Sequence, residues 1–380
     1  MYNFRNFQSD HLAIILFCIF PISILSGNFL INFVILIISS IFFIKLIKKK
    51  LNFFYYTESN YLFFLLLFLF LSMCINLIFS NDIGLSYQRV LKFFFVMFFI
   101  MMFKSLIINH SKNIENIYKI WSIIFLVVTI DLFIELVFGK NIIGYETKMY
   151  GRLGSFTGEE SVIGHFFLGF CLVFLSYNYN RSKNIYLNLS LVILLIFIAF
   201  FIGERANFIK IFFAIIIFSF FVYKLNLKIK LFFLSSIIIM FFLIFSNLSH
   251  TYKQRYINQL DFIERGISTY LDNSFYGAHR NVAKEIFLDN PIFGVGIKNF
   301  RIESRNKKYD NLDHKHNAAR GSTHPHELYY EFLSETGIFG LTCFLIFILT
   351  SLTLSFKNYL RTRNIYQLSG IIIVFIWNYA

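Results

Sequence analysis

Long apolar segments recur along almost the whole chain and are separated by shorter polar ones. A helix needs about 20 predominantly apolar residues to cross the hydrocarbon core of a bilayer. The pattern therefore predicts an all-α polytopic membrane protein with about 11 transmembrane helices, within a range of about 10 to 12. We expect residues 1–380 to form a single integral membrane domain. The predicted spans are residues 12–26, 29–47, 61–80, 90–109, 119–139, 162–177, 186–202, 207–223, 231–248, 337–356 and 366–380.

One polar segment, residues 249–336, is much longer than the others and separates the ninth and tenth predicted spans. Within it, residues 280–288 have an amphipathic pattern that predicts a short helix. This helix should stop at Asn290, because the residue before a proline disfavours helical geometry. The glycines that follow predict a turn. We therefore expect a long loop that contains short helices.

Positive charges are concentrated in one set of connections, which includes the N-terminus. This set carries 16 Lys and Arg residues against 3 acidic residues, whereas the rest of the chain carries 19 against 18. Cytoplasmic connections collect Lys and Arg, so the N-terminus is predicted to be cytoplasmic and residues 249–336 extracytoplasmic. The net charge of +14 therefore reflects topology and does not indicate a nucleic-acid partner. The set comprises residues 1–11, 45–60, 104–119, 178–185, 224–230 and 357–365.

Several ionisable residues lie in the outer halves of the predicted spans or at their outer ends. Such groups are costly near lipid and usually mark a functional cavity, which would here face outward. The alternative is that individual side chains reach the interface or form structural pairs. The residues are Lys92, Asp131, Glu135, Glu159, Glu160, His165, Glu204, Arg205 and Lys210.

Two outer stretches carry candidate binding residues. The stretch from Tyr150 to Gly169 contains Arg152 and the acidic residue Glu159. The acids in this stretch could instead favour a helix start capped by Thr157 or Ser161, but Arg152 has no such explanation. Residues 201–209 contain Arg205, which could alternatively form an ion pair with Glu204 or anchor the interface.

Six of the nine histidines fall within residues 249–336. The pattern His-x-His occurs twice there, and imidazole is a common zinc ligand. However, no HExxH motif or cysteine cluster accompanies it, and the four cysteines lie in apolar segments where we expect them to be packing residues. We therefore predict no metal and no cofactor. The chain also lacks GxxxxGK[ST] and a GxGxxG in a strand–helix context, so a nucleotide-driven pump is not indicated.

Four stretches, in order, resemble landmarks of the O-antigen ligase/polymerase superfamily. They are FTGEESVIG, GERANFI, NPIFGVGIKNFR and HPHELYYEFLSETGIFGL, and the resemblance covers roughly residues 85–356.

The ligase branch has His followed by Asn, Ser or Gln, then nine residues, Gly, two residues and Gly, Thr or Tyr. His326, Gly337 and Gly340 fit this pattern in register, whereas Glu327 departs from it. Arg205 to Ile209 fits the branch's Arg-x-x-x-Leu with Ile in place of Leu. The polymerase pattern of Arg, fifteen residues and Gly is satisfied once, by Arg280 and Gly296.

The resemblance implies an enzyme of the bacterial inner (cytoplasmic) membrane with a periplasmic active site. Its donor would be a glycan linked to undecaprenyl diphosphate, and its acceptor would be another glycan or a lipid. A chain-length regulator protein could be a further partner, and the enzyme would be in contact with membrane lipid. Fixed cations would stabilise the departing diphosphate, for which the candidates are Arg205, Arg280 and Arg152, with Glu159 also assigned to substrate binding. A histidine of near-neutral pKa can accept the proton of the acceptor hydroxyl. We assign this role to His326, oriented by Glu327 or His324.

The leading prediction is a polymerase that transfers the glycan to a lipid-linked repeat unit. The main alternative is a ligase that transfers it to lipid A-core or another surface acceptor. A polysaccharide transporter or flippase is a remote alternative, because the chain shows no convincing internal repeat and its charges lie at the outer rim. The enzyme prediction requires Arg205, Arg280 and His326 to share one extracytoplasmic pocket.

Overall fold

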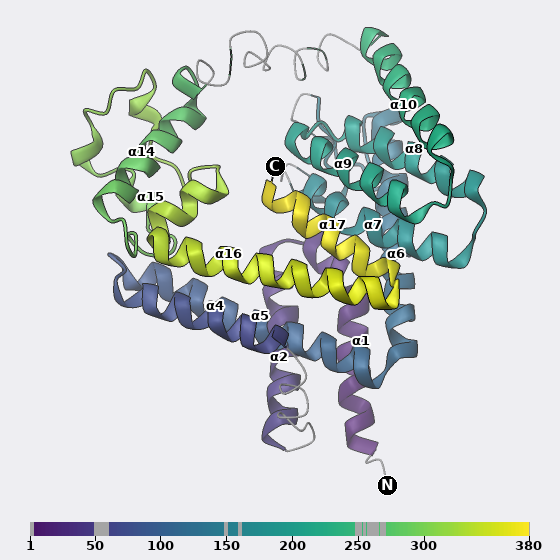
Figure 1. Cartoon of the computed structure of the whole chain (residues 1–380), viewed down its shortest axis with the longest axis horizontal. Helices are drawn as coiled ribbons and strands as arrows, with labels where there is room; N and C mark the ends of the chain where they lie inside the picture. The colour runs from purple at the N-terminus through teal and green to yellow at the C-terminus, as the bar shows by residue number, and fades with distance from the viewer. Residues whose placement is uncertain are drawn as a thin grey trace. The chain divides into compact units, whose positions relative to one another are not determined.

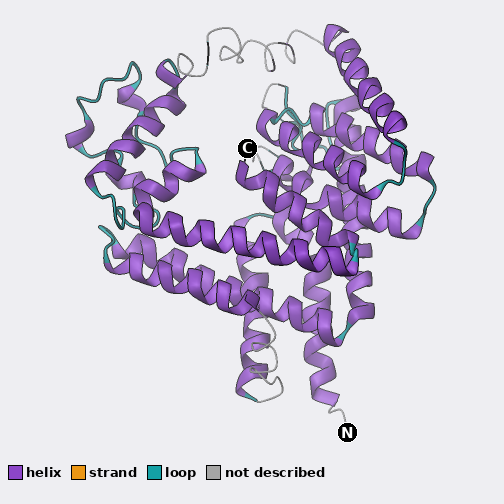
Figure 2. Cartoon of the chain, viewed as in Figure 1, coloured by secondary structure: helices purple, strands orange, loops and turns teal. Residues whose placement is uncertain are grey.

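A computed structural model describes residues 4–48, 61–147, 151–158, 162–247, 253, 256, 266 and 271–379. Throughout these ranges the regular structure is helical and no strand is present (Figure 2). Seven of the helices in the described residues are long and apolar enough to cross a membrane. They are α2 (Asn28–Ile47), α4 (Tyr61–Ile78), α5 (Ile83–Asn109), α6 (Ser111–Phe138), α9 (Arg205–Val222), α10 (Leu227–Asn247) and α16 (Leu328–Thr362).

Four further helices complete the apolar set. Three contain shorter apolar stretches, and helices overlap every one of the eleven predicted spans. The all-helical fold class is therefore confirmed, whereas the crossing of the membrane by all eleven helices stays a prediction. The four helices are α1 (Phe4–Leu25), α7 (Ile163–Arg181), α8 (Ile185–Phe201) and α17 (Ile365–Tyr379) (Figure 1).

The chain divides into two compact units. The first unit comprises Met1–Ile38, Lys104–Gln259 and Leu354–Ala380, and the second comprises Ser39–Phe103 and Leu260–Thr353. The predicted single integral membrane domain stays a prediction.

The first unit is a helical bundle with an aromatic and aliphatic core. Phe125 of α6, Phe167 of α7, Leu195 of α8 and Phe218 of α9 are all fully buried within it. Residues of α17 join the same core, and the indole of Trp121 donates a hydrogen bond of 2.6 Å to a backbone carbonyl of α1. Side chains from several helices therefore fill one common interior.

Two acidic residues of α6 hold the connection that follows this helix. Glu135 accepts hydrogen bonds from Thr147 Oγ1 (2.5 Å), Ser155 N (2.7 Å) and Gly154 N (3.1 Å). Asp131 accepts from Ile142 N at 2.8 Å and from the Ser155 hydroxyl. Both carboxylates are buried and are satisfied by these donors, so they hold the loop in place. The prediction that these two acids mark a functional cavity is therefore wrong.

The short helices of the second unit lie in the long polar segment. They are α14 (Phe275–Asp289), α15 (Phe300–Glu303), η2 (Lys307–Tyr309) and η3 (Asn317–Ala319). A small core that includes Val282, Ile286, Phe300 and Tyr309 packs α14, α15 and η2 together. The predicted helix at 280–288 is confirmed, and its end at Asp289 agrees with the proline signal. It begins earlier than expected, because Ser274 caps it by accepting from Gly277 N at 3.1 Å.

Helix α16 is interrupted at Gly337, whose φ of 63° and ψ of −167° are not helical. Residues 291–296 supply the hydrogen bonds that this interruption leaves open. Val295 N and Gly296 N donate to the carbonyls of Ser334 (3.0 Å) and Glu335 (2.8 Å). The amides of residues 338 and 339 donate to the carbonyls of residues 291 and 292. The Gly-rich turn thus replaces the missing turn of helix, and it fixes the loop to α16.

Candidate functional site

The structure gathers a cluster of imidazole rings between the start of α14 and the start of α16, all within the second unit. His279 of α14 is 9% exposed, and its Nε2 donates to the carbonyl of Ala319 at 3.1 Å. The ring of His326 stacks on His279 with centroids 5.3 Å apart and an interplanar angle of 27°. His324 also contacts His326, with a centroid distance of 4.0 Å. Tyr276 contacts His326 edge-on at 5.4 Å.

His326 carries two signs of a functional constraint. Its φ of 60° lies in the left-handed region, which a non-glycine residue adopts at a cost. Partial burial, together with the charges that His324 and His279 would carry, lowers the pKa of His326 to about 4. Its imidazole is therefore neutral at neutral pH and has a lone pair available to accept a proton.

Arg280 directly follows His279 on α14 and is held beside the histidine cluster. Its Nε lies 3.8 Å from a carboxylate oxygen of Glu327, and its Nη2 donates to the hydroxyl of Tyr330 at 3.2 Å. The guanidinium carbon also lies 4.8 Å from the centroid of the Tyr330 ring. The hydrogen bond to Tyr330 raises the pKa of Arg280, so this side chain remains a fixed cation. Planar stacking and a forked set of donors suit it to bind a phosphate.

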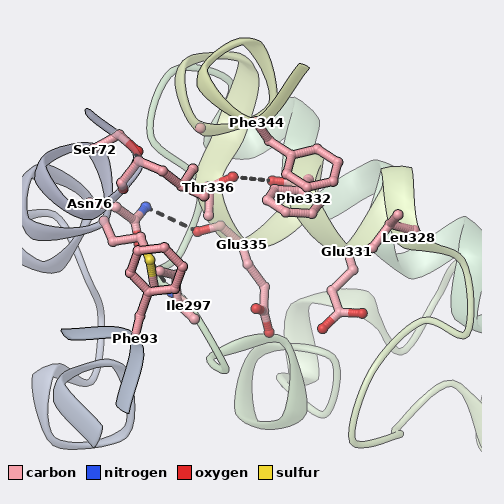
Figure 3. A pocket seen from close by; sticks show the side chains of 13 residues that line it. Ser72, Asn76, Phe93, Ile297, Leu328, Glu331, Phe332, Glu335, Thr336 and Phe344 are labelled. Carbon is pink, nitrogen blue, oxygen red and sulfur yellow. Dashed lines mark hydrogen bonds between the residues drawn. The ribbon is translucent and has the colours of Figure 1, made fainter. Parts of the chain in front are cut away.

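A pocket of ≈ 290 Å³ lies next to this cluster, along the first turns of α16 (Figure 3). One face of α16 lines it, because its lining residues recur at helical spacing from residue 328 to residue 344. In Figure 3 the side chains of Glu331 and Glu335 extend from α16 in the same direction. The remaining lining residues are mainly apolar and come from α4, α5, α16 and Ile297: they include Leu69, Met73, Phe93, Leu328, Phe332 and Phe344.

Two buried side chains fix the walls of this pocket. Asn76 of α4 donates to the carbonyls of Phe293 (2.7 Å) and Glu335 (3.2 Å), and its Oδ1 accepts from Ile297 N at 3.1 Å. The Glu335 carboxylate accepts from Lys298 N at 2.7 Å and from the amide of residue 300 at 3.3 Å. Four of these contacts join a helix to the 293–300 segment and one joins α4 to α16, so together they set the position of the loop on the two helices.

The other predicted arginines lie in the first unit. The backbone at Arg152 packs on the turn before α9, where Leu153 N donates to Ile202 O at 3.2 Å. Arg205 is the first residue of α9 and is half-buried. The alternative ion pair with Glu204 is wrong, because that carboxylate instead accepts from Asn207 Nδ2 at 2.5 Å and from a backbone amide of α7.

Three predictions concern the residues before α7. Glu159 and Ser161 lie outside the described residues. Capping of α7 by Thr157 is wrong, because Thr157 lies in η1 (Ser155–Thr157) and its hydroxyl donates to the carbonyl of Gly154 at 2.8 Å.

The structure thus brings Arg280, His324, His326 and Glu327 together in the second unit. Arg152 and Arg205 belong to the first unit. A pocket shared by Arg205, Arg280 and His326 stays a prediction.

Two other loop histidines have structural partners. The Nε2 atoms of His314 and His316 lie 3.0 and 3.1 Å from the carbonyls of Leu271 and Asn273. Among the described residues, no group of three or more His, Cys, Asp or Glu side chains is placed to hold a metal ion.

Sequence reasoning missed three members of this region: His279, Glu331 and Glu335. The acidic pair was visible as two carboxylates four residues apart at the start of an apolar helix, which places them on one face. His279 had no comparable signal, since its role depends on a ring contact with a residue far along the chain.

Repeated apolar helices and a polar site at the ends of some of them define a multi-pass membrane protein. Residues 190–345 match the family O-antigen ligase (Wzy_C). The predicted resemblance to the O-antigen ligase/polymerase superfamily, whose members are glycosyltransferase-type enzymes, is therefore confirmed over this part of the chain. The matched residues include Arg205, Arg280, His324, His326 and Glu327. A search of curated proteins found no match.

Proposed function

We propose that the protein is a surface-polysaccharide polymerase of the bacterial inner membrane. It transfers a growing glycan from undecaprenyl diphosphate to a lipid-linked repeat unit at the periplasmic face. The observation that carries this proposal is the placement of Arg280, Glu327 and His326 side by side within the region that matches the family. A fixed cation beside a neutral imidazole is the pair of groups that the transfer requires.

In the proposed reaction the acceptor hydroxyl attacks the anomeric carbon of the donor sugar. A new carbon–oxygen bond forms, the bond to the diphosphate oxygen breaks, and the electron pair leaves with the diphosphate. His326 accepts the hydroxyl proton, and Arg280 stabilises the charge on the leaving group. Arg205, Arg152 and Glu159 are assigned to the remaining contacts with donor and acceptor.

The low pKa of His326 predicts a specific pH dependence. Bound diphosphate is anionic and should favour the imidazolium, so it should raise the pKa of His326 in the substrate complex. Activity requires the neutral ring and is lost as pH falls through the relevant pKa. We expect kcat/KM, which reports the free enzyme, to stay level below the ordinary histidine pKa and to fall only towards about 4. The fall in kcat at low pH should occur at a higher pH than the fall in kcat/KM. If both parameters fell together near pH 6.5, the assignment of His326 would be contradicted.

Arg280 offers a second prediction. Arg280→Ala should lower transfer by about 100-fold, because a cation aimed at the developing charge is removed. Arg280→Lys should recover only part of that loss, since an ammonium cannot stack on Tyr330 or bind a phosphate with two parallel donors. The exposed Lys284, one turn along α14, provides the matched control as Lys284→Ala. Wild-type turnover by a normally inserted Arg280→Ala enzyme would exclude Arg280 from the site.

A ligase is the second candidate, because the matched family is described as O-antigen ligase and His326, Gly337 and Gly340 follow the ligase spacing. Glu327, which replaces the amide or hydroxyl of that pattern, favours the polymerase.

Purified protein can be given lipid-linked repeat units with and without lipid A-core. Lipid-linked products of two or more repeats identify a polymerase, whereas products formed only on lipid A-core identify a ligase. No transfer under either condition would contradict both.

A further inference from the structure

Three helix connections of the first unit meet at one pocket of ≈ 890 Å³. They join α7 to α8, α9 to α10 and α16 to α17, and all three belong to the positively charged connections that the sequence predicts to be cytoplasmic. Each connection contributes one cation to the lining: Lys183, Lys224 and Arg363. All three side chains are exposed, so a ligand that enters the pocket can reach them.

The rest of the lining is aromatic or aliphatic. Among the described residues that form the pocket, none is acidic. Glu115, an acidic residue of the same predicted cytoplasmic set, lines a different cavity. A pocket with three cations and an apolar wall fits an anion that is carried on a hydrocarbon group. The apolar wall consists of Ile185, Phe221, Val222, Leu225 and Ile365.

Two of the three cations lie over tyrosine rings that also line the pocket. The Nζ of Lys183 lies 3.8 Å from the centroid of the Tyr179 ring, and the guanidinium carbon of Arg363 lies 5.8 Å from that of Tyr359. Tyr179 in turn packs on Tyr223, which is 1% exposed, with ring centroids 5.6 Å apart. A ring face attracts a cation but does not use up its N–H donors, which can still bind an anion.

The three cations are not held by carboxylates. In the part of the chain that the structure describes, none of them forms an ion pair within 4.0 Å of an Asp or Glu oxygen. Their convergence therefore leaves an excess of positive charge around one cavity, which a bound anion would compensate.

Hydrogen bonds fix the connections that carry the two lysines. The fully buried Asn188 donates to the carbonyls of Ser182 at 3.0 Å and Asn184 at 2.8 Å, on either side of the first lysine. In the connection between α9 and α10, Leu225 N donates to the carbonyl of Tyr223 at 2.8 Å, across the second. Both lysines are therefore presented by defined turns.

Arg363 occupies a backbone position that suits glycine. Its φ is 52°, and its amide donates to the carbonyl of Tyr359 at 2.7 Å, which is the hydrogen bond of a left-handed helix C-cap. Glycine adopts this conformation without cost, whereas arginine does so with strain. A function of the guanidinium in the pocket would explain why the position carries an arginine.

We propose that this pocket binds the phosphate of an anionic phospholipid, with the acyl chains lying against the apolar wall. The inference goes beyond the proposed function and does not depend on it. Cations near a membrane surface attract anionic lipids. The rule that places Lys and Arg in cytoplasmic connections requires no common cavity, so the convergence of three cations on one pocket needs a further cause. The apolar wall favours a lipid over a soluble anion, because only a lipid would cover it.

The test is binding of phosphatidylglycerol to the purified full-length protein in detergent, measured by native mass spectrometry with phosphatidylcholine for comparison. Phosphatidylglycerol should bind more tightly than phosphatidylcholine. The triple substitution Lys183→Gln, Lys224→Gln and Arg363→Gln should weaken it by about 10-fold or more, because three cations at the headgroup are lost. The control removes three exposed cations of the same predicted set that do not line this pocket, by Lys112→Gln, Lys119→Gln and Arg361→Gln.

Wild-type affinity in the pocket variant, with normal thermal unfolding, would overturn the proposal. Equal weakening in the pocket and control variants would also overturn it, since that result would show general attraction between charges and no site.

Arg363→Gly separates binding from folding. Without lipid its thermal midpoint should equal or exceed that of the wild type, because glycine relieves the backbone strain. Phosphatidylglycerol should raise the midpoint less than in the wild type, because a ligand stabilises the folded state in proportion to its binding. A rise as large as that of the wild type would contradict the proposal.

Two further probes identify the ligand. Inorganic phosphate and a peptide of glutamate residues should each fail to displace phosphatidylglycerol at equal concentration. Displacement by phosphate that is absent in the pocket variant would show a site for a soluble anion. Displacement by the peptide that is absent in the same variant would show a docking site for an acidic protein segment. Either result would overturn the proposal.

Discussion

His326→Asn should abolish most glycan transfer while leaving the protein as stable as the wild type. Asparagine tolerates the left-handed backbone that residue 326 adopts, so the substitution adds no strain. It cannot accept a proton as imidazole does, and loss of a general base lowers the rate by about 100- to 10,000-fold. Turnover of lipid-linked repeat units and thermal unfolding in the same detergent measure the two properties separately.

His316→Asn is the matched control, because His316 lies in the same loop and contacts a backbone carbonyl and Phe275. We expect its activity to stay close to wild type. If His326→Asn turned over normally, or if both variants lost activity equally, His326 would not be the base. His326→Gly should also be inactive, but it should be more stable than His326→Asn, because glycine adopts the left-handed backbone without strain.

Gly337→Ala should prevent formation of the site by disrupting the fold of the second unit. A Cβ at this position would lie 2.3 Å from the carbonyl oxygen of Ile292 and 2.4 Å from its carbon, both backbone atoms. The backbone conformation itself is almost confined to glycine, so we expect a loss of about 3 kcal/mol. Reduced yield of folded protein and a lower thermal midpoint are the measurements.

Gly370→Ala serves as the comparison. A Cβ at Gly370 meets nothing within 4 Å, and this residue lies within helix α17. The change should therefore be neutral or stabilising by up to about 1 kcal/mol, because alanine is the better helix former. Equal tolerance of both substitutions would show that the turn at residues 291–296 can separate from α16 without loss of the fold.

The helices were predictable because their signal is local. An apolar run of sufficient length identifies a helix without knowledge of its neighbours, and the end of α14 before Pro291 followed from proline geometry. The grouping of Arg280, His326 and Glu327 was anticipated through the family pattern, since each residue occupies a recognisable position in it. Arg280 lies 3.8 Å from Glu327, and His326 stacks on His279, the residue before Arg280, whereas their roles in the reaction stay predictions.

The remaining features depend on contacts between distant segments. Asp131 was misread because a buried carboxylate satisfied by a backbone amide and a serine hydroxyl looks in the sequence like one that faces a cavity. The attachment of Asn299 to the start of α5 was not recognised because its partners there lie more than 200 residues earlier in the chain. His279 lacked a signal for the same reason. Such residues become visible only once the fold joins the segments that carry them.

Asn76 has a consequence for how the protein is made. Its amide lies near the end of α4, yet its partners are a carbonyl 217 residues later and another 259 residues later. During translation α4 is therefore complete long before either partner has left the ribosome. The nascent chain must keep this amide hydrated or bonded elsewhere until α16 is inserted. Maturation of the pocket is consequently a late event in biogenesis, and a chain released before residue 335 cannot complete it.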